Sequence, residues 1–430
     1  MENESLKAAF KHVREVSFSL SSASDAERRD AIISVKNALA ENKEYIFAEN
    51  EKDLQEAKGV LSDAVMHRLR FSDDKLDSVI KGLEEISLLP DPIGCIREKR
   101  ELDPVFILEK RTFPIGVIGM IFEARPDALV QIAGLALRSG NAIILKGGKE
   151  ANHSNAALYD VIRKATAQYS FGSDWIYLLK SHSDVDELLK AEGDVDLLIP
   201  RGSNAFVRYV MDHTRIPVMG HADGICSVYI DKSADLDIAL KVAIDSKIQY
   251  PAACNAAETI LVHKDIASSF IPLFGKAASA AGVIIHAPDD VAGFLGEYVP
   301  ATEDDFNKEY LALECAIGIV SSEEEAIRHI NEHGSHHTDA IVAQDESAKK
   351  MFFMSVDSAD VFANCSTRFA DGFRFGLGAE VGISTSKLHA RGPVGLDGLT
   401  TTKWILSGNG ETVAEYSGKN GKCFHHKELI

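Results

Sequence analysis

Apolar positions in the first ninety residues recur at the spacing of an α-helix. Ser24 followed by Glu27 is a capping-box signature. The run behind this signature brings Ile32 and Leu39 to one helical face, and Pro90 closes the region. The pattern predicts a helical N-terminal segment.

Beyond this segment the pattern changes to short apolar runs. Apolar and polar residues alternate over residues 101–112, which indicates two strands of a hairpin. From residue 114 onward, strand-like and helix-like segments alternate in two series, which predicts doubly wound α/β sheets with mainly parallel strands. The strands expected are 116–122, 142–145, 175–179 and 197–200, then 227–230, 259–263, 283–286, 317–320, 340–343 and 361–364, and a late strand at 403–406.

The C-terminal part is less regular. Residues 372–398 are rich in glycine and predict loops rather than core. The last residues, among them Lys419, Lys422 and His425, predict a polar tail.

Length and composition narrow the classes of function. The 430 residues suggest two or three domains, and 45% apolar with 26% charged residues is typical of a globular protein. Lys plus Arg number 46 and Asp plus Glu 65, so the formal charge is 46 − 65 = −19. This charge argues against a nucleic-acid partner and against binding to anionic membranes. Six cysteines without a CxxC pair, and no apolar run near the ~20 residues of a membrane span, favour the reducing cytoplasm.

A cofactor site is indicated by one short turn. The chain has no G-x-G-x-x-G, Walker lysine loop or H-E-x-x-H motif. Lys146, Gly147, Gly148 and Lys149 follow a strand and open a helix, where glycines allow close approach and lysines suit phosphate and ribose oxygens. Residues 201–204 repeat this arrangement. An ordinary strand–helix turn with solvated lysines fits the spacing equally well.

Cys254 is the most suggestive thiol. It lies among small residues after Pro251, where the sulfur would be accessible to a ligand. A small buried hydrophobe in a tight loop is the commoner fate of cysteine, and both interpretations stay open from the residues alone. Cys226, Cys315 and Cys365 lie on or beside apolar strands and fit the buried alternative better.

Two further segments carry anion-binding residue types. Glu123 and Arg125, with Asp127, follow a predicted strand at its carboxyl end, where open α/β sheets bind ligands. Arg125 there can bind a carboxylate or phosphate, or form a structural ion pair with either acid. The segment 384–393, which contains Arg391, can be a substrate loop or merely a connecting loop.

The densest group of histidines is His329, His333, His336 and His337. A metal site is conceivable there, but no carboxylate or cysteine set accompanies them. We therefore predict no metal, and interpret the group as a helix end with a polar loop.

Four segments together resemble a known family. They are residues 122–127, the segment around Cys254, His333–Asp339 and Gly376–Pro393, and they are similar to the gamma-glutamyl phosphate reductases, also called glutamate-5-semialdehyde dehydrogenases, of the aldehyde dehydrogenase superfamily. From the resemblance we expect the stand-alone form, without the kinase domain that is fused to some relatives. The resemblance implies two doubly wound α/β domains with a β-hairpin for oligomerisation. It assigns 1–100 and 113–225 to a dinucleotide-binding domain, 226–397 to a catalytic domain, and 101–112 with 398–430 to the oligomerisation hairpin and tail.

The resemblance also implies roles for single residues. Cys254 matches the nucleophile and Lys146 the lysine that holds the adenine ribose. Gly202 and Ser203 match a pyrophosphate-binding pair, and Glu314 matches the glutamate that holds the nicotinamide ribose. The residues expected to bind substrate are Glu123, Arg125, His221, Asn255 and Arg391.

Three departures from the wider superfamily refine these expectations. Lys149 stands where relatives that prefer NAD often carry glutamate, which favours NADPH. The oxyanion asparagine loop is replaced by Glu123-Ala-Arg125. Residues 219–224 contain no glutamate to activate water, so a thioester on Cys254 would be protected from hydrolysis.

The activity expected from the resemblance is NADPH-dependent reduction of L-glutamate 5-phosphate to L-glutamate 5-semialdehyde through a cysteine thioester, in proline biosynthesis. An oxidising aldehyde dehydrogenase acting on another small aldehyde and a non-catalytic cofactor-binding protein are the alternatives. The expected partners are the acyl phosphate substrate, other copies of the chain in a homo-oligomer, and a glutamate 5-kinase.

Overall fold

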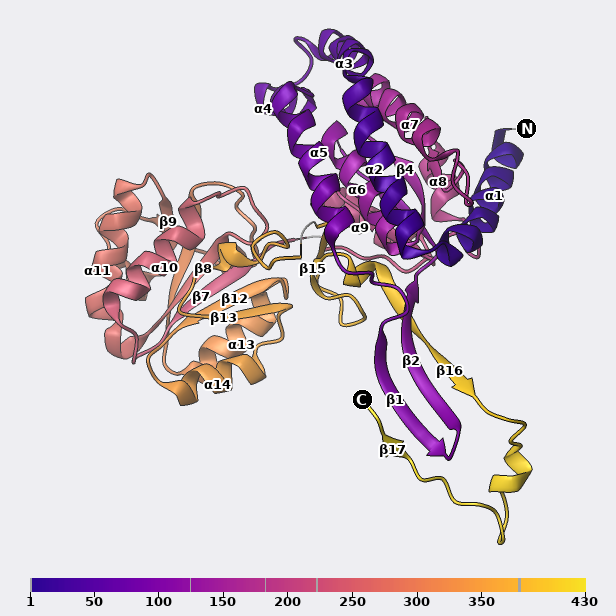
Figure 1. Cartoon of the computed structure of the whole chain (residues 1–430). Helices are drawn as coiled ribbons and strands as arrows, with labels where there is room; N and C mark the ends of the chain where they lie inside the picture. Colours follow the sequence, from indigo (N-terminus) through magenta and orange to yellow (C-terminus); the bar gives the residue numbers. More distant parts are fainter. Residues whose placement is uncertain (1, 124, 182, 222, 378–379) are drawn as a thin grey trace. The chain divides into compact units, whose positions relative to one another are not determined.

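The computed structural model describes residues 2–123, 125–181, 183–221, 223–377 and 380–430 (Figure 1). The chain divides into two compact units. Unit 1 comprises the residues up to Gly202, Tyr209–Met219 and Val394–Ile430, and unit 2 comprises Ser203–Arg208 and Gly220–Pro393. The functional roles expected for these regions stay predictions.

The N-terminal helices of unit 1 are present as predicted. They are α1 (Glu2–Ser22), α2 (Asp25–Glu41), α3 (Lys43–Ala57), α4 (Asp63–Leu69) and α5 (Asp73–Leu88). The Ser24 side chain accepts a hydrogen bond from the Glu27 backbone N–H at 3.2 Å, which caps α2. The Glu27 carboxylate accepts instead from the backbone N–H of Ser170, at 2.8 Å.

A four-stranded parallel sheet forms the core of unit 1, in the order β5-β4-β3-β6. Every residue of β3 and β4 is buried, which is why both read as continuous apolar runs. Gly140 ends α6 in the left-handed conformation, with φ 70°. The elements are β3 (Val117–Ile121), α6 (Pro126–Ser139), β4 (Ala142–Lys146), η1 (Lys149–Ala151), α7 (Asn152–Thr166), β5 (Ile176–Leu178), α8 (Ser183–Leu189), β6 (Leu197–Pro200) and α9 (Asn204–His213).

A second sheet of unit 1 confirms the predicted hairpin and late strand. It has the antiparallel order β16-β2-β1-β17, from β1 (Ile96–Asp103), β2 (Phe106–Pro114), β16 (Thr400–Ser407) and β17 (Lys427–Glu428). Figure 1 shows these strands running side by side. Short 3₁₀ turns, η4 (Asp397–Leu399) and η5 (Val413–Tyr416), flank β16.

The C-terminal segment is not simply the polar tail that the sequence predicted. β17 pairs with β1, and the Tyr416 ring stacks between Phe106, at 6.1 Å between ring centroids, and Phe424, at 4.5 Å. The Tyr416 hydroxyl donates a hydrogen bond to Asp103 at 2.9 Å. Aromatic stacking and strand pairing between residues far apart in sequence therefore order this segment.

Unit 2 is built on a seven-stranded parallel sheet in the order β10-β9-β11-β8-β7-β12-β13. Alternate residues face opposite sides: Val228 and Ile260 pack with α10 and α11, whereas Tyr229 and Leu261 pack with α13 and α14. Helices therefore cover both faces, as predicted for a doubly wound sheet (Figure 1). The elements are β7 (Cys226–Ile230), α10 (Leu236–Ile248), β8 (Ala257–His263), α11 (Lys264–Ala280), β9 (Ile284–Ala287), α12 (Asp289–Ala292), β10 (Val299–Pro300), η2 (Glu303–Asn307), β11 (Glu314–Val320), α13 (Glu323–His333), β12 (Thr338–Val342), α14 (Glu346–Ser355), β13 (Asp360–Ala363), η3 (Thr367–Phe369), β14 (Gly382–Ser384) and β15 (Gly392–Val394).

No helix among the described residues is both long and apolar enough to cross a membrane.

Candidate active site

Cys254 lies in the turn that connects α10 to β8, and its thiol is half-buried. The backbone of Gly224 passes directly against it: a Cβ at position 224 would lie 2.1 Å from the Cys254 carbonyl oxygen and 2.5 Å from its Cα. The Cys226 thiol donates a hydrogen bond to the same carbonyl at 3.3 Å. These contacts fix the backbone of Cys254 on the loop that leads into β7.

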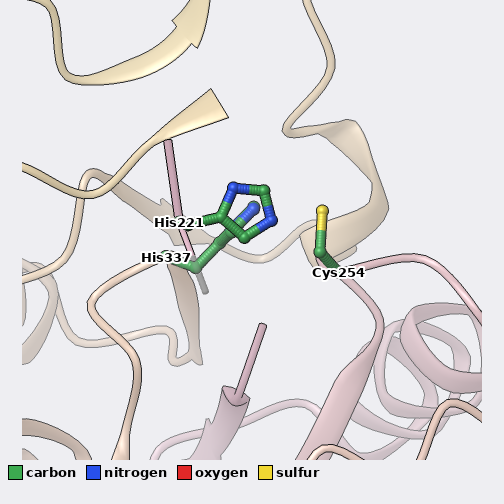
Figure 2. Close-up of side chains that lie close together, drawn as sticks. All are labelled: His221, Cys254 and His337. Carbon is green, nitrogen blue, oxygen red and sulfur yellow. The ribbon is translucent and has the colours of Figure 1, made fainter. Parts of the chain in front are cut away.

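Three side chains from three separate loops meet at this point (Figure 2). His221, Cys254 and His337 precede β7, β8 and β12, which are neighbours in the sheet, so the amino ends of three adjacent parallel strands bring them together. One donor atom from each, the Cys254 Sγ and a ring nitrogen of each histidine, lies within 4.8 Å of the others. The two imidazole rings meet edge to face, with centroids 4.8 Å apart.

The two histidines are held differently. His221 Nδ1 is 3.0 Å from the carbonyl oxygen of Ile383, which fixes the orientation of the ring. His337 is fully buried, and its Nδ1 is 2.8 Å from the Thr338 hydroxyl. The pKa of His337 lies well below its usual range. Burial is the largest cause, and the charges of His221 and Arg368 lower the pKa further. His337 is therefore a neutral imidazole, and its Nε2 has no hydrogen-bond partner among the described residues.

A thiolate and two imidazoles are ligand types that a soft cation such as Zn²⁺ accepts, and a thiol next to imidazoles is also suited to nucleophilic chemistry. Of the four histidines clustered in the sequence, only His337 belongs to this group. His333 Nδ1 is 3.0 Å from the Asn307 side chain, and the His329 ring packs against that of His333 at 4.3 Å. Burial lowers the pKa of His329 to about 4.

Arg368 is a residue of this site that the sequence did not reveal. It lies in η3, is 9% exposed, and donates from Nε to the Gln249 side chain at 2.9 Å. Its charge interacts with Cys254 and with His337. Its position four residues after an expected strand, and four residues before the glycine-rich region, was the available signal.

Asn255 and Arg391, two residues expected to bind substrate, make contacts within unit 2. The Asn255 amide donates to the Ala370 carbonyl at 2.6 Å, and its Oδ1 is buried without a partner in the described part of the chain. Arg391 donates to Asp357 from Nη2, at 3.0 Å to the backbone oxygen and 3.2 Å to the carboxylate. Lys387 and Arg391 both hold the pKa of Asp357 below its usual range. Arg391 is thus engaged in an ion pair.

The expected cofactor turn lies between β4 and α7 in unit 1. Lys146 is 6% exposed, and burial lowers the pKa of its ammonium group. Its Nζ donates one hydrogen bond to the Gly147 carbonyl, so two of its three N–H donors remain for a ligand. A Cβ on Gly147 would lie 2.1 Å from the Asn155 amide, and Asn155 is buried. Lys149 is exposed. A bare backbone beside a helix N-terminus, with one buried and one exposed lysine, fits a phosphate-bearing dinucleotide.

The remaining expected cofactor residues flank strands as well. Gly202 follows β6, and Ser203 accepts from the Phe206 backbone N–H at 3.4 Å, so Ser203 lies at the start of α9. Glu314 opens β11 in unit 2, and its carboxylate is 3.1 Å from His286 Nε2.

Glu123 and Arg125 follow β3 in unit 1, on the carboxyl edge that the sequence predicted. The Arg125 guanidinium donates to Asp127 at 3.2 Å, so the structural ion pair forms, although the Arg125 side chain is 55% exposed. The structure does not bring these residues into the same unit as Cys254.

Comparisons with known proteins agree with the arrangement of two parallel sheets and an antiparallel arm. The sequence profile of the aldehyde dehydrogenase family matches residues 1–313. A gamma-glutamyl phosphate reductase from Natronomonas pharaonis is 48% identical over 432 residues, which cover 99% of this chain and 98% of that protein. One from Prochlorococcus marinus is 48% identical over 97% of this chain and 95% of that protein.

Solved structures lead to the same group. The crystal structure of the gamma-glutamyl phosphate reductase from Thermotoga maritima superimposes with a TM-score of 0.92 at 36% identity, and the match covers 95% of this chain and 99% of that one.

Proposed function

The chain belongs to the aldehyde dehydrogenase family and, within it, to the gamma-glutamyl phosphate reductases, and from this premise we propose that it reduces L-glutamate 5-phosphate to L-glutamate 5-semialdehyde with release of phosphate, using NADPH. It is an oxidoreductase of proline biosynthesis that acts on aldehyde groups. The observation that carries the proposed mechanism is the half-buried Cys254 thiol beside two histidines.

In the proposed reaction the Cys254 thiolate attacks the acyl carbon, the bond from that carbon to the phosphate oxygen breaks, and phosphate leaves. NADPH, when bound, supplies the hydride that the thioester carbon accepts. The carbon–sulfur bond then breaks, the aldehyde departs, and the thiolate is restored. Burial holds the pKa of His337 below its usual range, so its imidazole is a weak base, and we assign it a hydrogen bond from a ring N–H to an oxygen of the substrate.

The cofactor contacts that we propose come from the residues that the sequence suggested. In unit 1, Lys146, Lys149 and the backbone of Gly147 and Gly148 would hold ribose and phosphate groups, with the exposed Lys149 beside the 2′-phosphate. Gly202 and Ser203 would contribute the strand–helix turn after β6, and Glu314 of unit 2 would accept from the nicotinamide ribose.

An oxidising aldehyde dehydrogenase, the alternative, needs a carboxylate that activates water against the thioester. The acid in the relevant loop is Asp223, which accepts from the Asn204 amide at 2.8 Å and forms an ion pair with Arg208. Glu258, near the same strands, is fully buried and paired with Lys247 at 2.5 Å. Each of these carboxylates is engaged by a neighbouring cation, which supports phosphate rather than water as the partner of the thioester.

We further propose that the enzyme is a cytoplasmic homo-oligomer. β16 is an edge strand of the antiparallel sheet, and Trp404 and Leu406 on it are each 50% exposed. An unpaired strand edge with large apolar side chains is the kind of surface that a second copy of the chain covers. Transfer of the labile acyl phosphate from a glutamate 5-kinase belongs to the same proposal.

The deciding experiment is the reverse reaction, in which glutamate semialdehyde reduces NADP⁺. We expect turnover that requires phosphate or arsenate and that is faster with NADP⁺ than with NAD⁺. Cys254→Ala should lower kcat by more than about 10³-fold with the fold intact, because no other group replaces the nucleophile. The matched control is Cys365→Ala, a half-buried thiol in the same unit. Undiminished turnover in Cys254→Ala would refute the nucleophile, and turnover without phosphate would favour the oxidising alternative.

A further inference from the structure

The segment that follows β13 is fastened beside the nucleophile. The Thr367 backbone N–H donates to the Ser246 hydroxyl of α10 at 3.2 Å. Three residues later, the Ala370 carbonyl accepts from the amide of Asn255, the residue directly after Cys254, at 2.6 Å. Arg368 lies between these two anchors, so its position relative to the Cys254 turn is fixed from both sides.

The Arg368 side chain is held by neutral groups. Its Nε donates to Gln249 at 2.9 Å, and its guanidinium carbon lies 5.8 Å from the centroid of the Tyr250 ring. Among the residues that the structure describes, none accepts a hydrogen bond from Nη1 or Nη2, and no carboxylate lies within 4.0 Å of the guanidinium. The contacts therefore orient the planar group and leave its fork of donors unused.

Three other arginines of unit 2 differ in this respect. Arg391 is paired with Asp357, Arg208 with Asp223 and Arg374 with Asp371. An arginine that is largely removed from water without a counter-charge has a considerable desolvation cost, which a bound anion offsets. Burial and the neighbouring Arg374 lower the pKa of Arg368, whereas Cys254 raises it, so the guanidinium lies within electrostatic range of the nucleophile.

We propose that the Nη1 and Nη2 donors of Arg368 bind an oxyanion of the substrate, either the departing phosphate or the carboxylate at the far end of the glutamyl chain. This inference rests on the proposed function, because it needs a substrate with those two anionic groups. A planar guanidinium donates two parallel hydrogen bonds to the two oxygens of either group. Arg391 and Arg125, for which the sequence suggested this role, are each paired with an aspartate.

The test measures two Michaelis constants in the reverse reaction, for phosphate and for glutamate semialdehyde, at saturating NADP⁺. Arg368→Ala should raise one of them about tenfold or more, and Arg368→Lys, which keeps the charge but loses the fork, should raise the same one by less. A rise for phosphate assigns Arg368 to the leaving group, and a rise for semialdehyde assigns it to the distal carboxylate. Arg328→Ala, an exposed arginine on α13, is the matched control.

A second measurement applies if Arg368→Ala turns over too slowly for steady-state kinetics. The rate of alkylation of Cys254 by iodoacetamide is followed with increasing inorganic phosphate or L-glutamate, and half-maximal protection should need at least tenfold more of one anion in Arg368→Ala. Unchanged Michaelis constants together with unchanged protection would overturn the proposal, as would a shift in the pH midpoint of alkylation with no effect on protection. A wild-type enzyme without phosphate-dependent turnover would instead refute the proposed function itself.

Discussion

The two parallel sheets of this enzyme place the residues that we propose as functional at opposite ends of the strands. In unit 1, Glu123, Lys146 and Gly202 lie at or just after the carboxyl ends of β3, β4 and β6. In unit 2, His221, Cys254 and His337 come before β7, β8 and β12, at amino ends. The first arrangement offers glycine-rich turns and helix N-termini, which suit a phosphate-bearing ligand.

The second arrangement offers side chains on loops that lie against one another. The amino ends of adjacent parallel strands are only about 5 Å apart, so loops that enter neighbouring strands must pack closely. Gly224 against Cys254 is the result of this crowding. The comparison teaches that the proposed binding in unit 1 relies on turns with one buried and one exposed lysine, whereas the proposed chemistry in unit 2 relies on the fit between loops.

The largest effect is expected where that fit is tightest. Gly224→Ala would push a methyl group into the Cys254 carbonyl oxygen, 2.1 Å from the position of the new Cβ, so the turn must move. A displacement of about 1 Å at a nucleophile lowers kcat by about 10²-fold. We expect this loss in steady-state assays, with cooperative unfolding retained in thermal melts.

Gly293→Ala is the control for this substitution, since no atom lies within 4 Å of a Cβ at that position. Equal activity of Gly224→Ala and the wild type would show that the loops are not closely fitted, and would remove the contrast between the units.

A smaller and more selective effect is expected at the exposed donors of unit 1. Lys149→Glu places a negative charge beside the proposed 2′-phosphate, and the side chain is exposed, so the fold should be unaffected. The Michaelis constant for NADPH should rise about tenfold or more, with little change for NADH.

Lys58→Glu, at an exposed position in the same unit, controls for the change in net charge. Equal changes for both dinucleotides in Lys149→Glu would contradict the role in recognition of the 2′-phosphate.

The smallest effect concerns the stability of the loops in unit 2. Burial raises the pKa of Asp339 to about 7, and its carboxylate accepts from the Ser227 backbone N–H at 2.6 Å and from the Ser358 hydroxyl. Between pH 4 and 7 the folded state retains a proton that the unfolded state has released, so stability falls as the pH rises through this window. Asp339→Asn should remove this dependence.

The difference in unfolding free energy between Asp339→Asn and the wild type should therefore increase with pH, by at most roughly 1.4 kcal/mol per pH unit. Urea unfolding at several pH values measures it, and Asp237→Asn, exposed at the start of α10, is the control. A difference that stays constant across the window would show that Asp339 is ionised in the folded state throughout.

The sequence predicted the strands of both parallel sheets except β10, because each of the others is a short apolar run. The cofactor turn, suggested because Lys146 and its glycines are contiguous, stays a prediction. The sequence also singled out Cys254, whose neighbours are small and local. It could not predict that His221 and His337 meet at Cys254, because their approach depends on the order of β8, β7 and β12 in the sheet. Arg368 was missed for a similar reason: its importance follows from contacts with Gln249 and Tyr250, which are distant along the chain.

The pairing of β17 with β1 was missed because it rests on two residues of a polar segment, which show no periodicity. Tyr416 and Phe424 were the only local signal, since two aromatic residues in an otherwise polar segment usually have something to pack against.

The bare backbone of Gly224 beneath Cys254 also matters for protein engineering. Any library that randomises position 224 will consist almost entirely of inactive members, however well the new side chains suit a different acyl chain. Diversity aimed at new substrates belongs instead in the residues around Arg368, where the chain already tolerates exposed phenylalanines at 369 and 373. A library that keeps Gly224 and Cys254 constant and varies the residues around Arg368 would change the range of substrates without disturbing the nucleophile.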